Sequence, residues 1–217
     1  MRLAVIGGGE FGTYHARQLV GARVGEVVVV DRDRGCRAFA ELGGAVTPVV
    51  AEWDRFLESE VGSSLVAGDH VVPAPFAPHV LWDWLASGSG LRRVAPLTGW
   101  RLPYEVVAPD GALFVSASGW LCPATCVEPA HCPVLHAPRD WDLGVLLEVG
   151  ARERGWEPVL FRCLHFARGI GTVPVASLLE ARARVRALGR GSRVLVATSS
   201  RCHAAVGGLE VAAAAHG

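Results

Sequence analysis

The sequence predicts an α/β protein: a parallel sheet with helices on both faces, followed by a smaller α/β portion that carries a cysteine-rich loop. Three observations predict this fold. Short apolar runs alternate with amphipathic stretches over residues 1–99, a glycine-rich turn joins the first run to the first amphipathic stretch, and the alternation resumes after residue 142. Alternating strands and helices typically build a parallel sheet that is covered on both sides.

Composition limits the classes of function. The 217 residues are 51% hydrophobic and 19% charged, which suffices for one large domain or two small ones with buried cores. The 21 basic and 21 acidic side chains cancel, so the chain offers no basic surface for nucleic acid, and we expect no nucleic-acid partner. All basic residues are arginine, which excludes Schiff-base and general-base chemistry by lysine.

The apolar runs are too short to cross a membrane. The longest are Val27–Val30 and Val211–Ala215, whereas a spanning helix needs about 20 residues. Glycines interrupt the apolar start after Ile6, so a secretory signal is not expected. We therefore expect a cytoplasmic protein without membrane contact, in which the six cysteines are thiols or ligands rather than disulfides.

A glycine-rich turn follows the first expected strand. Leu3–Ile6 is apolar, Thr13–Val20 is amphipathic, and between them stands Gly7-Gly8-Gly9-Glu10-Phe11-Gly12. This is G-x-G-x-x-G in the strand, turn and helix setting of a dinucleotide-binding Rossmann unit. Gly7 permits the tight turn, Gly9 admits the pyrophosphate, and Gly12 lets the helix pack close to the strand. We expect the cofactor to contact Gly7, Gly9, Glu10, Phe11 and Gly12.

The end of the second expected strand bears on the choice of dinucleotide. Val27–Val30 runs into Asp31, and a carboxylate at this place accepts hydrogen bonds from the ribose hydroxyls, which favours NAD. Arg32 and Arg34 follow, and an arginine here can pair with a 2′-phosphate, so NADP stays open. We expect both Asp31 and Arg32 to contact the cofactor.

The remaining elements of the first domain, residues 1–99, continue the alternation. We expect strands near residues 45–50, Val71 and residues 93–96, with helices over Trp53–Glu60 and Val80–Ser87. Four aromatic residues in these helices are expected to pack in the core: Trp53, Phe56, Trp82 and Trp84.

The second domain, residues 100–217, begins with a hairpin. Residues 104–108 and 112–116 flank the turn sequence Pro109-Asp110-Gly111. A cysteine-rich segment, Trp120–His136, follows and is called the cysteine loop below. After it we expect helices over Leu143–Arg154 and Val175–Leu188, strands over Pro158–Cys163 and Arg193–Thr198, and a short tail. This portion could extend the first sheet or form a small α/β unit of its own.

The cysteine loop predicts a metal centre. Cys122, Cys126 and Cys132 stand within eleven residues that contain two prolines and are followed by a third, and these prolines exclude helix and central strand. Three soft thiolates favour an iron–sulfur cluster, a four-iron cluster in particular, over structural zinc. The spacing C-x3-C-x5-C matches neither a ferredoxin run nor a zinc knuckle, so reactive or simply reduced thiols stay an alternative.

The fourth ligand of the metal centre could be Cys163, Cys202, His131 or His136. Alternatively, one iron of the cluster has no fourth protein ligand and is open to substrate. Cys163 and Cys202 each follow an expected strand, with His165 and His203 beside them. Both pairs could therefore lie at the carboxyl edge of a sheet, where α/β proteins place ligands. The run Gly169-Ile170-Gly171-Thr172 could form a second anion-binding turn before the next helix.

The first part of the chain resembles a known family. Val5–Leu19, with its glycines followed by His15-Ala16-Arg17, is similar to the opening of the glucose-fructose oxidoreductase and inositol dehydrogenase family. The likeness covers residues 1–95 and includes Asp31, the run Arg37–Ala40, and Asp69–Pro75 followed by His79. The resemblance implies an NAD(P)-binding Rossmann domain in which Pro73, Pro75 and His79 lie beside the nicotinamide ribose.

The likeness ends after residue 95. Arg92–Pro96 stands where that family has a Glu-Lys-Pro motif with a catalytic lysine, and too few residues remain for the family's substrate domain. The resemblance therefore implies the dinucleotide site but not the sugar chemistry.

These observations predict an NAD(P)-dependent oxidoreductase whose metal centre acts on a small-molecule substrate. Nicotinamide moves two electrons as hydride whereas a cluster takes one at a time, so the centre would act on bound substrate as a Lewis acid or electron donor. A redox- and nucleotide-sensing protein and an assembly protein that delivers metal or sulfur are the alternatives. No serine triad or H-E-x-x-H helix indicates hydrolysis. Substrate and catalytic residues stay open, as does a homodimer.

Overall fold

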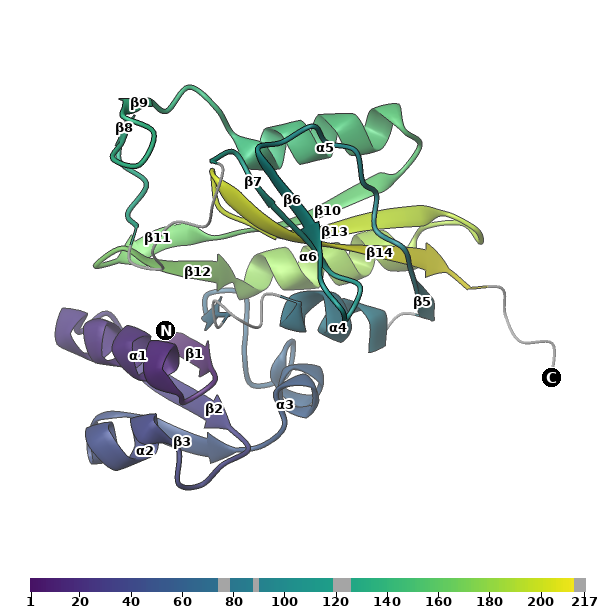
Figure 1. Ribbon diagram of the computed structural model, residues 1–217. Helices are drawn as coiled ribbons and strands as arrows, with labels where there is room; N and C mark the ends of the chain where they lie inside the picture. The colour runs from purple at the N-terminus through teal and green to yellow at the C-terminus, as the bar shows by residue number, and fades with distance from the viewer. Residues whose placement is uncertain (74–78, 88–89, 119–125, 213–217) are drawn as a thin grey trace, which may run out of the picture. The chain divides into compact units, whose positions relative to one another are not determined.

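The computed structural model describes residues 1–73, 79–87, 90–118 and 126–212, and these residues form a mixed α/β protein with two six-stranded sheets and one two-stranded sheet (Figure 1). The chain divides into two compact units. Unit 1 comprises Met1–Val80 and Leu164–Glu180, and unit 2 comprises Leu81–Cys163 and Ala181–Gly217. Within the described ranges, no helix is both long and apolar enough to cross a membrane.

Unit 1 is built on a sheet with the strand order β11-β12-β4-β1-β2-β3. Its elements are β1 (Arg2–Ile6), α1 (Glu10–Ala22), β2 (Glu26–Asp31), α2 (Arg37–Leu42), a 3-10 turn (Gly43–Ala45), β3 (Thr47–Val50), α3 (Trp53–Glu60), β4 (His70–Val72), β11 (Leu164–Ala167) and β12 (Ile170–Pro174). Strands β3, β2, β1 and β4 are parallel, whereas β12 and β11 are antiparallel to their neighbours. The strand order reverses at β1, and open α/β sheets bind ligands outside the carboxyl ends of strands at such a reversal.

The central strand β1 of unit 1 is apolar and buried on both of its faces. Leu3 and Val5 of β1 belong to the same core cluster as Ala16 of α1. Ala4 and Ile6 alternate with them, point to the opposite face, and are also fully buried. Near-continuous apolar strands of this kind are typical of parallel sheets with two covered faces.

Unit 2 is built on a sheet with the order β10-β13-β14-β7-β6, and β5 pairs with the end of β14. Its elements are α4 (Val80–Ser87), β5 (Leu91–Val94), β6 (Tyr104–Val107), β7 (Leu113–Ser116), β8 (His131–Cys132), β9 (Ala137–Pro138), α5 (Leu143–Glu153), β10 (Glu157–Arg162), β13 (Arg193–Ser199) and β14 (His203–Val211). Helix α6 (Val175–Arg186) begins in unit 1 and ends in unit 2. Only β10 and β13 pair in parallel among the described strands of this sheet.

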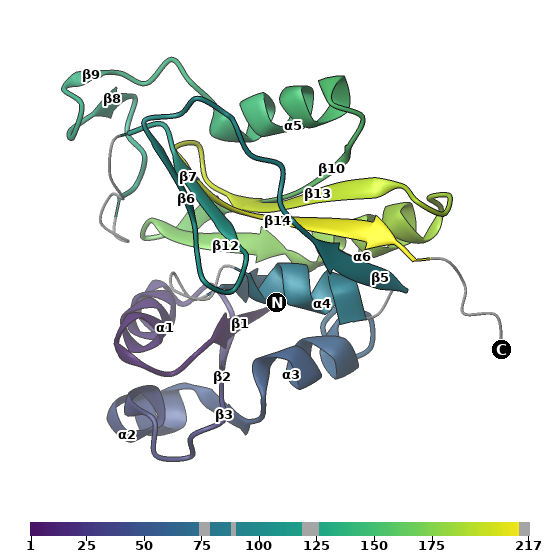
Figure 2. The same ribbon diagram turned by 45° about the vertical axis from the view of Figure 1, so that its right-hand side comes forward.

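Helices also cover both faces of the second sheet. Figures 1 and 2 show α5 along one face and α4 along the other. On the α5 face, Leu143 and Leu147 pack with Leu195 of β13. On the α4 face, the ring of Trp84 meets Phe161 edge-on with 6.5 Å between centroids. Trp84 is fully buried, as its expected role in the core requires.

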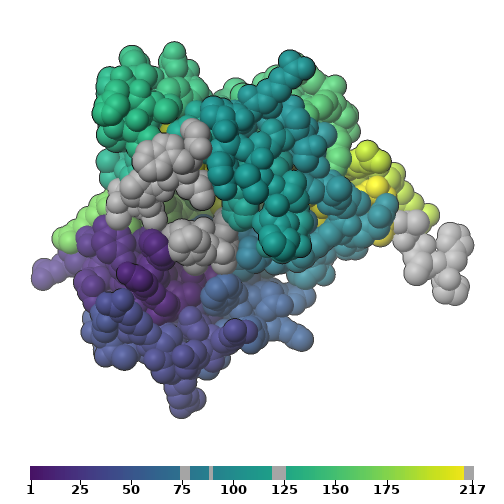
Figure 3. All heavy atoms as spheres, viewed as in Figure 1, coloured from purple at the N-terminus to yellow at the C-terminus, as the bar shows by residue number. Residues whose placement is uncertain are grey.

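The expected hairpin at residues 104–116 is confirmed. Strands β6 and β7 pair antiparallel, and the turn is closed by Gly111, which has a φ of 87° and donates its N–H to Ala108 O over 2.9 Å. The hairpin, in teal, lies on the face drawn in Figure 3. Val106 and Val107 of β6 are 46% and 53% exposed, as expected of an edge strand.

Long-range pairing corrects the sequence expectation in three places. The strand near residues 93–96 was expected in the first parallel sheet, but β5 pairs antiparallel with β14 in the second. The expected short tail is instead the nine-residue strand β14. The run at residues 169–172, expected as an anion-binding turn, belongs largely to β12, which pairs with β4.

The two units also divide the chain differently from the expected domains 1–99 and 100–217. The chain passes into unit 2 after Val80, returns to unit 1 for the β11–β12 hairpin and the start of α6, and leaves again after Glu180. The second half of the chain therefore does two things: β11 and β12 extend the first sheet, and the remainder builds a second sheet.

Helix α5 depends on an N-cap that can be tested. Asp142 Oδ1 accepts the N–H of Val145 over 3.1 Å, and the same carboxylate pairs with Arg162. Replacing Asp142 with alanine removes the cap and should lower the free energy of unfolding by about 1 kcal/mol, since the partly exposed ion pair adds little. Urea unfolding would measure the change, and Asp142→Asn, which keeps a capping oxygen, should retain most of the stability. Equal losses in the two variants would contradict the capping role.

Candidate dinucleotide turn and cysteine cluster

The glycine turn, residues 7–12, joins β1 to α1 at the carboxyl edge of the first sheet. Gly7 has a φ of 93° and donates its N–H to Val30 O over 2.8 Å, which fastens the turn to β2. A Cβ on Gly12 would lie 1.8 Å from Gly7 O. Glycine at these two positions therefore lets α1 begin this close to β1.

Gly9 is the N-cap of α1 and leaves space in front of the helix. A Cβ on Gly9 would meet no described atom within 4 Å. Glu10 is exposed and Phe11 is half-buried in the first turn that follows. First-turn amides have no acceptor within their own helix, and the helix dipole favours negative charge there. This end of α1 can therefore admit a phosphate close to the Gly9 backbone.

Asp31 ends β2 and turns its carboxylate toward the glycine turn. Its Oδ2 accepts the N–H of Gly8 over 2.6 Å, and its Oδ1 accepts the N–H of Asp33 over 2.9 Å. A carboxylate has about four lone-pair directions, so both oxygens can still accept from ribose hydroxyls. Arg32 is exposed in the turn that follows.

Strand register brings several of the expected cofactor residues to one edge. Because β1 is parallel and in register with β2 and β4, the residues at the carboxyl ends of these strands lie side by side. These residues are Gly7, Asp31 and Pro73. Pro75 lies outside the described residues, and His79 is half-buried in the turn before α4.

Cys36 adjoins the glycine turn, and no local pattern in the sequence indicates it. It is the N-cap of α2, and a Cβ on Gly8 would lie 2.3 Å from its Sγ. Ala38 of the same helix donates its N–H to Gly8 O over 2.9 Å. Burial, and then the charge of Asp31, raises the pKa of the Cys36 thiol. The first turn of α2 thus holds the glycine turn in place with a neutral thiol against it.

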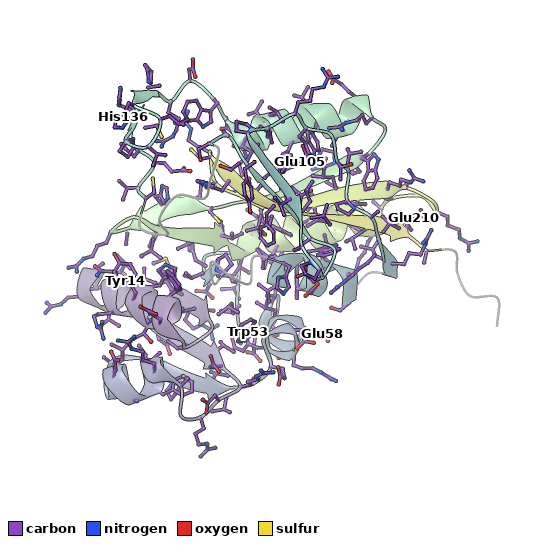
Figure 4. All side chains as sticks on the ribbon, viewed as in Figure 1. Tyr14, Trp53, Glu58, Glu105, His136 and Glu210 are labelled. Atoms are coloured by element: carbon purple, nitrogen blue, oxygen red, sulfur yellow. The ribbon has the colours of Figure 1, made fainter. Side chains whose placement is uncertain are left out.

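His15 of α1 is a buried imidazole. It is 5% exposed, and its Nδ1 has no hydrogen-bond partner among the described residues. Tyr14, labelled in Figure 4, meets it edge-on with 5.8 Å between ring centroids. Burial lowers the pKa of His15 to about 4, so the ring is neutral at physiological pH.

The described part of the cysteine loop is a small hairpin in unit 2. Strand β8 carries His131 and Cys132 and pairs with β9. His131 is exposed whereas Cys132 is 1% exposed, because neighbouring residues of a strand point to opposite sides. His136, labelled in Figure 4, is exposed and has a φ of 50°. Cys122 lies outside the described residues.

Cys132 and Cys126 lie near one buried arginine, Arg139. The N–H of Leu135 points to Cys132 Sγ over 3.5 Å, and this contact, together with the charge of Arg139, lowers the pKa of the Cys132 thiol. Arg139 is 6% exposed, and burial opposes its charge, but its hydrogen bond to Cys202 and electrostatic interactions with Cys202, Glu128 and Cys126 hold its pKa above the usual value. One guanidinium therefore links the cysteine loop to Cys202.

Cys202 lies in the turn between β13 and β14 and is 2% exposed. Its Sγ accepts Nε–H of Arg139 over 3.1 Å and Nε1–H of Trp141 over 3.3 Å. Burial nevertheless raises the pKa of the free thiol. Both donors belong to the segment before α5, and the N–H of Leu143 joins that segment to the turn by donating to Arg201 O over 2.9 Å.

Cys163 follows β10 at the same edge of the second sheet. Its N–H donates to Ser199 O, the last residue of β13, over 2.8 Å. The residue is half-buried, but desolvation of the sulfur raises the pKa of the Cys163 thiol to about 12. His165 belongs to β11 in unit 1 and is exposed, whereas His203 begins β14. The expectation that Cys163 and Cys202 lie near the carboxyl edge of a sheet thus agrees with the fold.

The five described cysteines are free thiols: Cys36, Cys126, Cys132, Cys163 and Cys202. Within the described part of the chain, no three side chains of histidine, cysteine, aspartate or glutamate form a group that could hold a metal ion. The metal centre expected at Cys122, Cys126 and Cys132 therefore stays a prediction that depends on Cys122.

The described residues form a mixed α/β protein with the glycine turn in one unit. The other unit holds Cys126, Cys132 and Cys202 near Arg139, and these three residues are called the cysteine cluster below. Residues 79–212 match the model of the family AF_1314_C, described as "uncharacterized protein, C-terminal domain", and the chain belongs to this family. The matched span runs from the start of α4 to the end of β14 and includes the cysteine cluster. No curated protein matches the chain. No solved structure matches it either.

Proposed function

We propose that the protein is an NAD(P)-binding oxidoreductase whose first unit is a Rossmann-like dinucleotide site and whose second unit holds a thiolate metal centre. The observation that carries the dinucleotide site is the glycine turn: Gly12 lies against Gly7 O, where a side chain has no room, whereas Gly9 faces open space. Close packing at one glycine and free approach at another are the two requirements of pyrophosphate binding at a helix N-terminus.

The carboxylate of Asp31 supports NAD as the preferred dinucleotide. Its hydrogen bond from Gly8 fixes its position beside the turn, and a 2′-phosphate placed there would meet its negative charge. Arg32 is exposed in the adjoining turn and could offset that charge, which leaves NADP as the weaker ligand. Bound dinucleotide would supply or accept hydride, and the chain's own residues would hold it through Gly7–Gly12, Asp31 and the Pro73 edge of the sheet.

The cysteine cluster supports the metal centre through its donors. The thiols of Cys126 and Cys132 lie near a buried cation, Arg139, which would offset the charge that thiolates bring to a metal. Soft thiolates are ligands of iron–sulfur clusters and of zinc, and we propose an iron–sulfur cluster held by Cys122, Cys126 and Cys132. The centre would act on a small-molecule substrate.

A substitution at Gly9 tests the dinucleotide site. Valine at Gly9 fills only open space and keeps an extended N-cap conformation, so the free energy of unfolding should change by less than about 1 kcal/mol. The same side chain would occupy the place of the pyrophosphate, so the affinity for NADH should fall at least about tenfold. Calorimetric titration of wild type and Gly9→Val with NADH measures the difference.

The control is stability measured on the same preparations. A Gly9→Val protein that unfolds like wild type and has lost NADH binding supports the proposal. An unchanged NADH affinity in that well-folded variant would refute the assignment of the glycine turn as the pyrophosphate site.

A further inference from the structure

Helix α5 exposes an apolar face opposite the one that packs on the second sheet. Val145, Leu146 and Val149 are 49%, 42% and 47% exposed. Leu143 and Leu147 of the same helix are buried in the core of unit 2. Figures 1 and 2 show α5 on the outer side of this sheet. The three exposed side chains therefore form one surface on the outside of unit 2, called the α5 face below.

The first two turns of α5 are apolar on every side. Of the eight residues Leu143–Gly150, only Glu148 is charged. A helix that is apolar all round is typically buried, and a contiguous exposed apolar surface commonly marks a protein contact. Because the core of unit 2 covers one side of α5, the α5 face has the character of a contact surface.

The α5 face ends in side chains of opposite charge. Asp142, the N-cap of α5, lies three residues before Val145, and Arg152 lies three residues after Val149. The spacing of three, four and three residues places these four side chains on one side of the helix, as in the seam of paired helices. Along this seam the order is therefore negative, apolar, apolar, positive.

This order is self-complementary. A second copy of α5, antiparallel about a two-fold axis halfway between Val145 and Val149, would place each Val145 against Val149 of the other copy. The same pairing places each Asp142 beside Arg152 of the other copy, which adds an attraction at both ends. Glu153, one residue further, lies beyond the start of the other copy's helix. A two-fold axis closes the assembly at two copies.

The charges at both ends have capacity for this contact. Arg152 pairs with Glu148 of its own helix and Asp142 pairs with Arg162, yet the side chains of Arg152 and Asp142 are 52% and 30% exposed. A guanidinium has five N–H donors and a carboxylate about four lone-pair directions, so each can take a second partner. The formal net charge of the chain is zero, so two copies do not repel each other.

We propose that α5 is the contact helix of a two-fold homodimer, in which Val145 and Val149 of the two copies pack together between two pairs of Asp142 and Arg152. Leu146 widens the apolar contact on one flank. The inference depends on unit 2 alone and is independent of the dinucleotide site and the metal centre. Because one helix contributes a small area, we expect the dimer to dissociate on dilution in the micromolar range.

Sedimentation equilibrium of the full-length protein, from about 1 to 500 µM, tests the proposal. Wild type should shift from the 22.9 kDa monomer toward twice that mass as the concentration rises. Val149→Glu should raise the dissociation constant at least about tenfold, because its carboxylate would lose water against Val145 and lie near Asp142 of the other copy. Urea unfolding at a concentration where wild type is monomeric checks that the variant is folded.

Val107→Glu is the matched control. Val107 is 53% exposed on the edge strand β6 of the same unit, so the same charge is introduced away from α5. Its dissociation constant should equal that of wild type. The inference is overturned if wild type stays monomeric throughout, or if Val149→Glu weakens the dimer no more than Val107→Glu does.

Disulfide trapping tests the register and covers the case in which Val149→Glu does not fold. Val145→Cys and Val149→Cys proteins are mixed and oxidised with copper–phenanthroline, and peptide mapping separates the new bond from bonds of native cysteines. The mixture should form a bond between positions 145 and 149, and each variant alone should cross-link about tenfold less. Identical positions lie about 6 Å out of step along the antiparallel helices, which is unfavourable for a disulfide. Cross-linking as strong in the single variants as in the mixture, or no bond between positions 145 and 149, would contradict the antiparallel pairing.

Discussion

Gly12→Ala should destabilise the protein by about 3 kcal/mol or more and abolish NADH binding. The new Cβ would lie 1.8 Å from Gly7 O and 2.8 Å from Gly7 C, and both atoms belong to backbone that cannot turn aside. Either α1 or the end of β1 must move, which breaks the packing of Leu3 and Val5 against the helix. Denaturant unfolding measures the loss through the midpoint, with the slope as a check on two-state behaviour.

Gly44→Ala is the control for this substitution. Gly44 lies in the 3-10 turn of the same unit, and a Cβ there would meet no described atom within 4 Å. We expect its unfolding midpoint to stay within experimental error of wild type or to rise slightly, because alanine restricts the unfolded chain. If Gly12→Ala unfolds at the same denaturant concentration as Gly44→Ala, the close approach of α1 to β1 is not what stabilises the turn.

Acidification from pH 6.5 to pH 4 should cost the protein about 3 kcal/mol of stability through His15. Burial lowers the pKa of His15 from 6.5 to about 4, so between these values the unfolded chain binds a proton that the folded chain does not. The part of the free energy of unfolding that depends on a neutral His15 is therefore at its full value above pH 6.5. It falls as the pH drops toward 4, by 1.36 kcal/mol per unit of pKa difference. Unfolding at a series of pH values measures the slope.

His15→Leu is the informative variant for the pH profile. Leucine fills an apolar site and cannot take a proton, so most of the slope between pH 6.5 and 4 should disappear. Burial also lowers the pKa of His70, which leaves a smaller slope of the same sign in the variant. A pH profile in His15→Leu as steep as that of wild type would show that His15 does not titrate in this window.

Elements with a strong local signal were predictable from the sequence. The helices α3 and α4 have the expected bounds, because each is amphipathic or apolar over two turns. The strand β14 was missed because its centre is Ala204-Ala205-Val206-Gly207-Gly208, which has little strand propensity. Its glycines have a tertiary cause: a Cβ on Gly207 would lie 2.3 Å from the Trp82 ring, and one on Gly208 would lie 2.7 Å from Ala95 O.

Pairing between distant strands was not predictable from one sequence. The strand β5 follows a helix as the strands before it do, yet it pairs with β14, more than 100 residues later. The residues Leu164–Pro174 form a hairpin that adds to the first sheet from the far end of the chain. Local patterns carry periodicity but not the identity of the partner strand.

The residues of the candidate sites also fall into two groups, those that the sequence predicts and those that only the fold shows. Gly7, Gly9, Gly12 and Asp31 follow a spacing that has a physical cause within one strand, turn and helix, so they could be found in the sequence. Arg139 and Trp141 gain their roles only from the fold, which places them next to Cys202, 63 and 61 residues later in the chain.

The dinucleotide site is tested by calorimetric titration of the wild-type protein with NADH, and separately with NADPH. We expect one site per chain, with NADH bound more tightly than NADPH because Asp31 lies where a 2′-phosphate would be placed. Binding of neither dinucleotide at millimolar concentration by protein with a normal unfolding transition would contradict the claim that the glycine turn is a dinucleotide site.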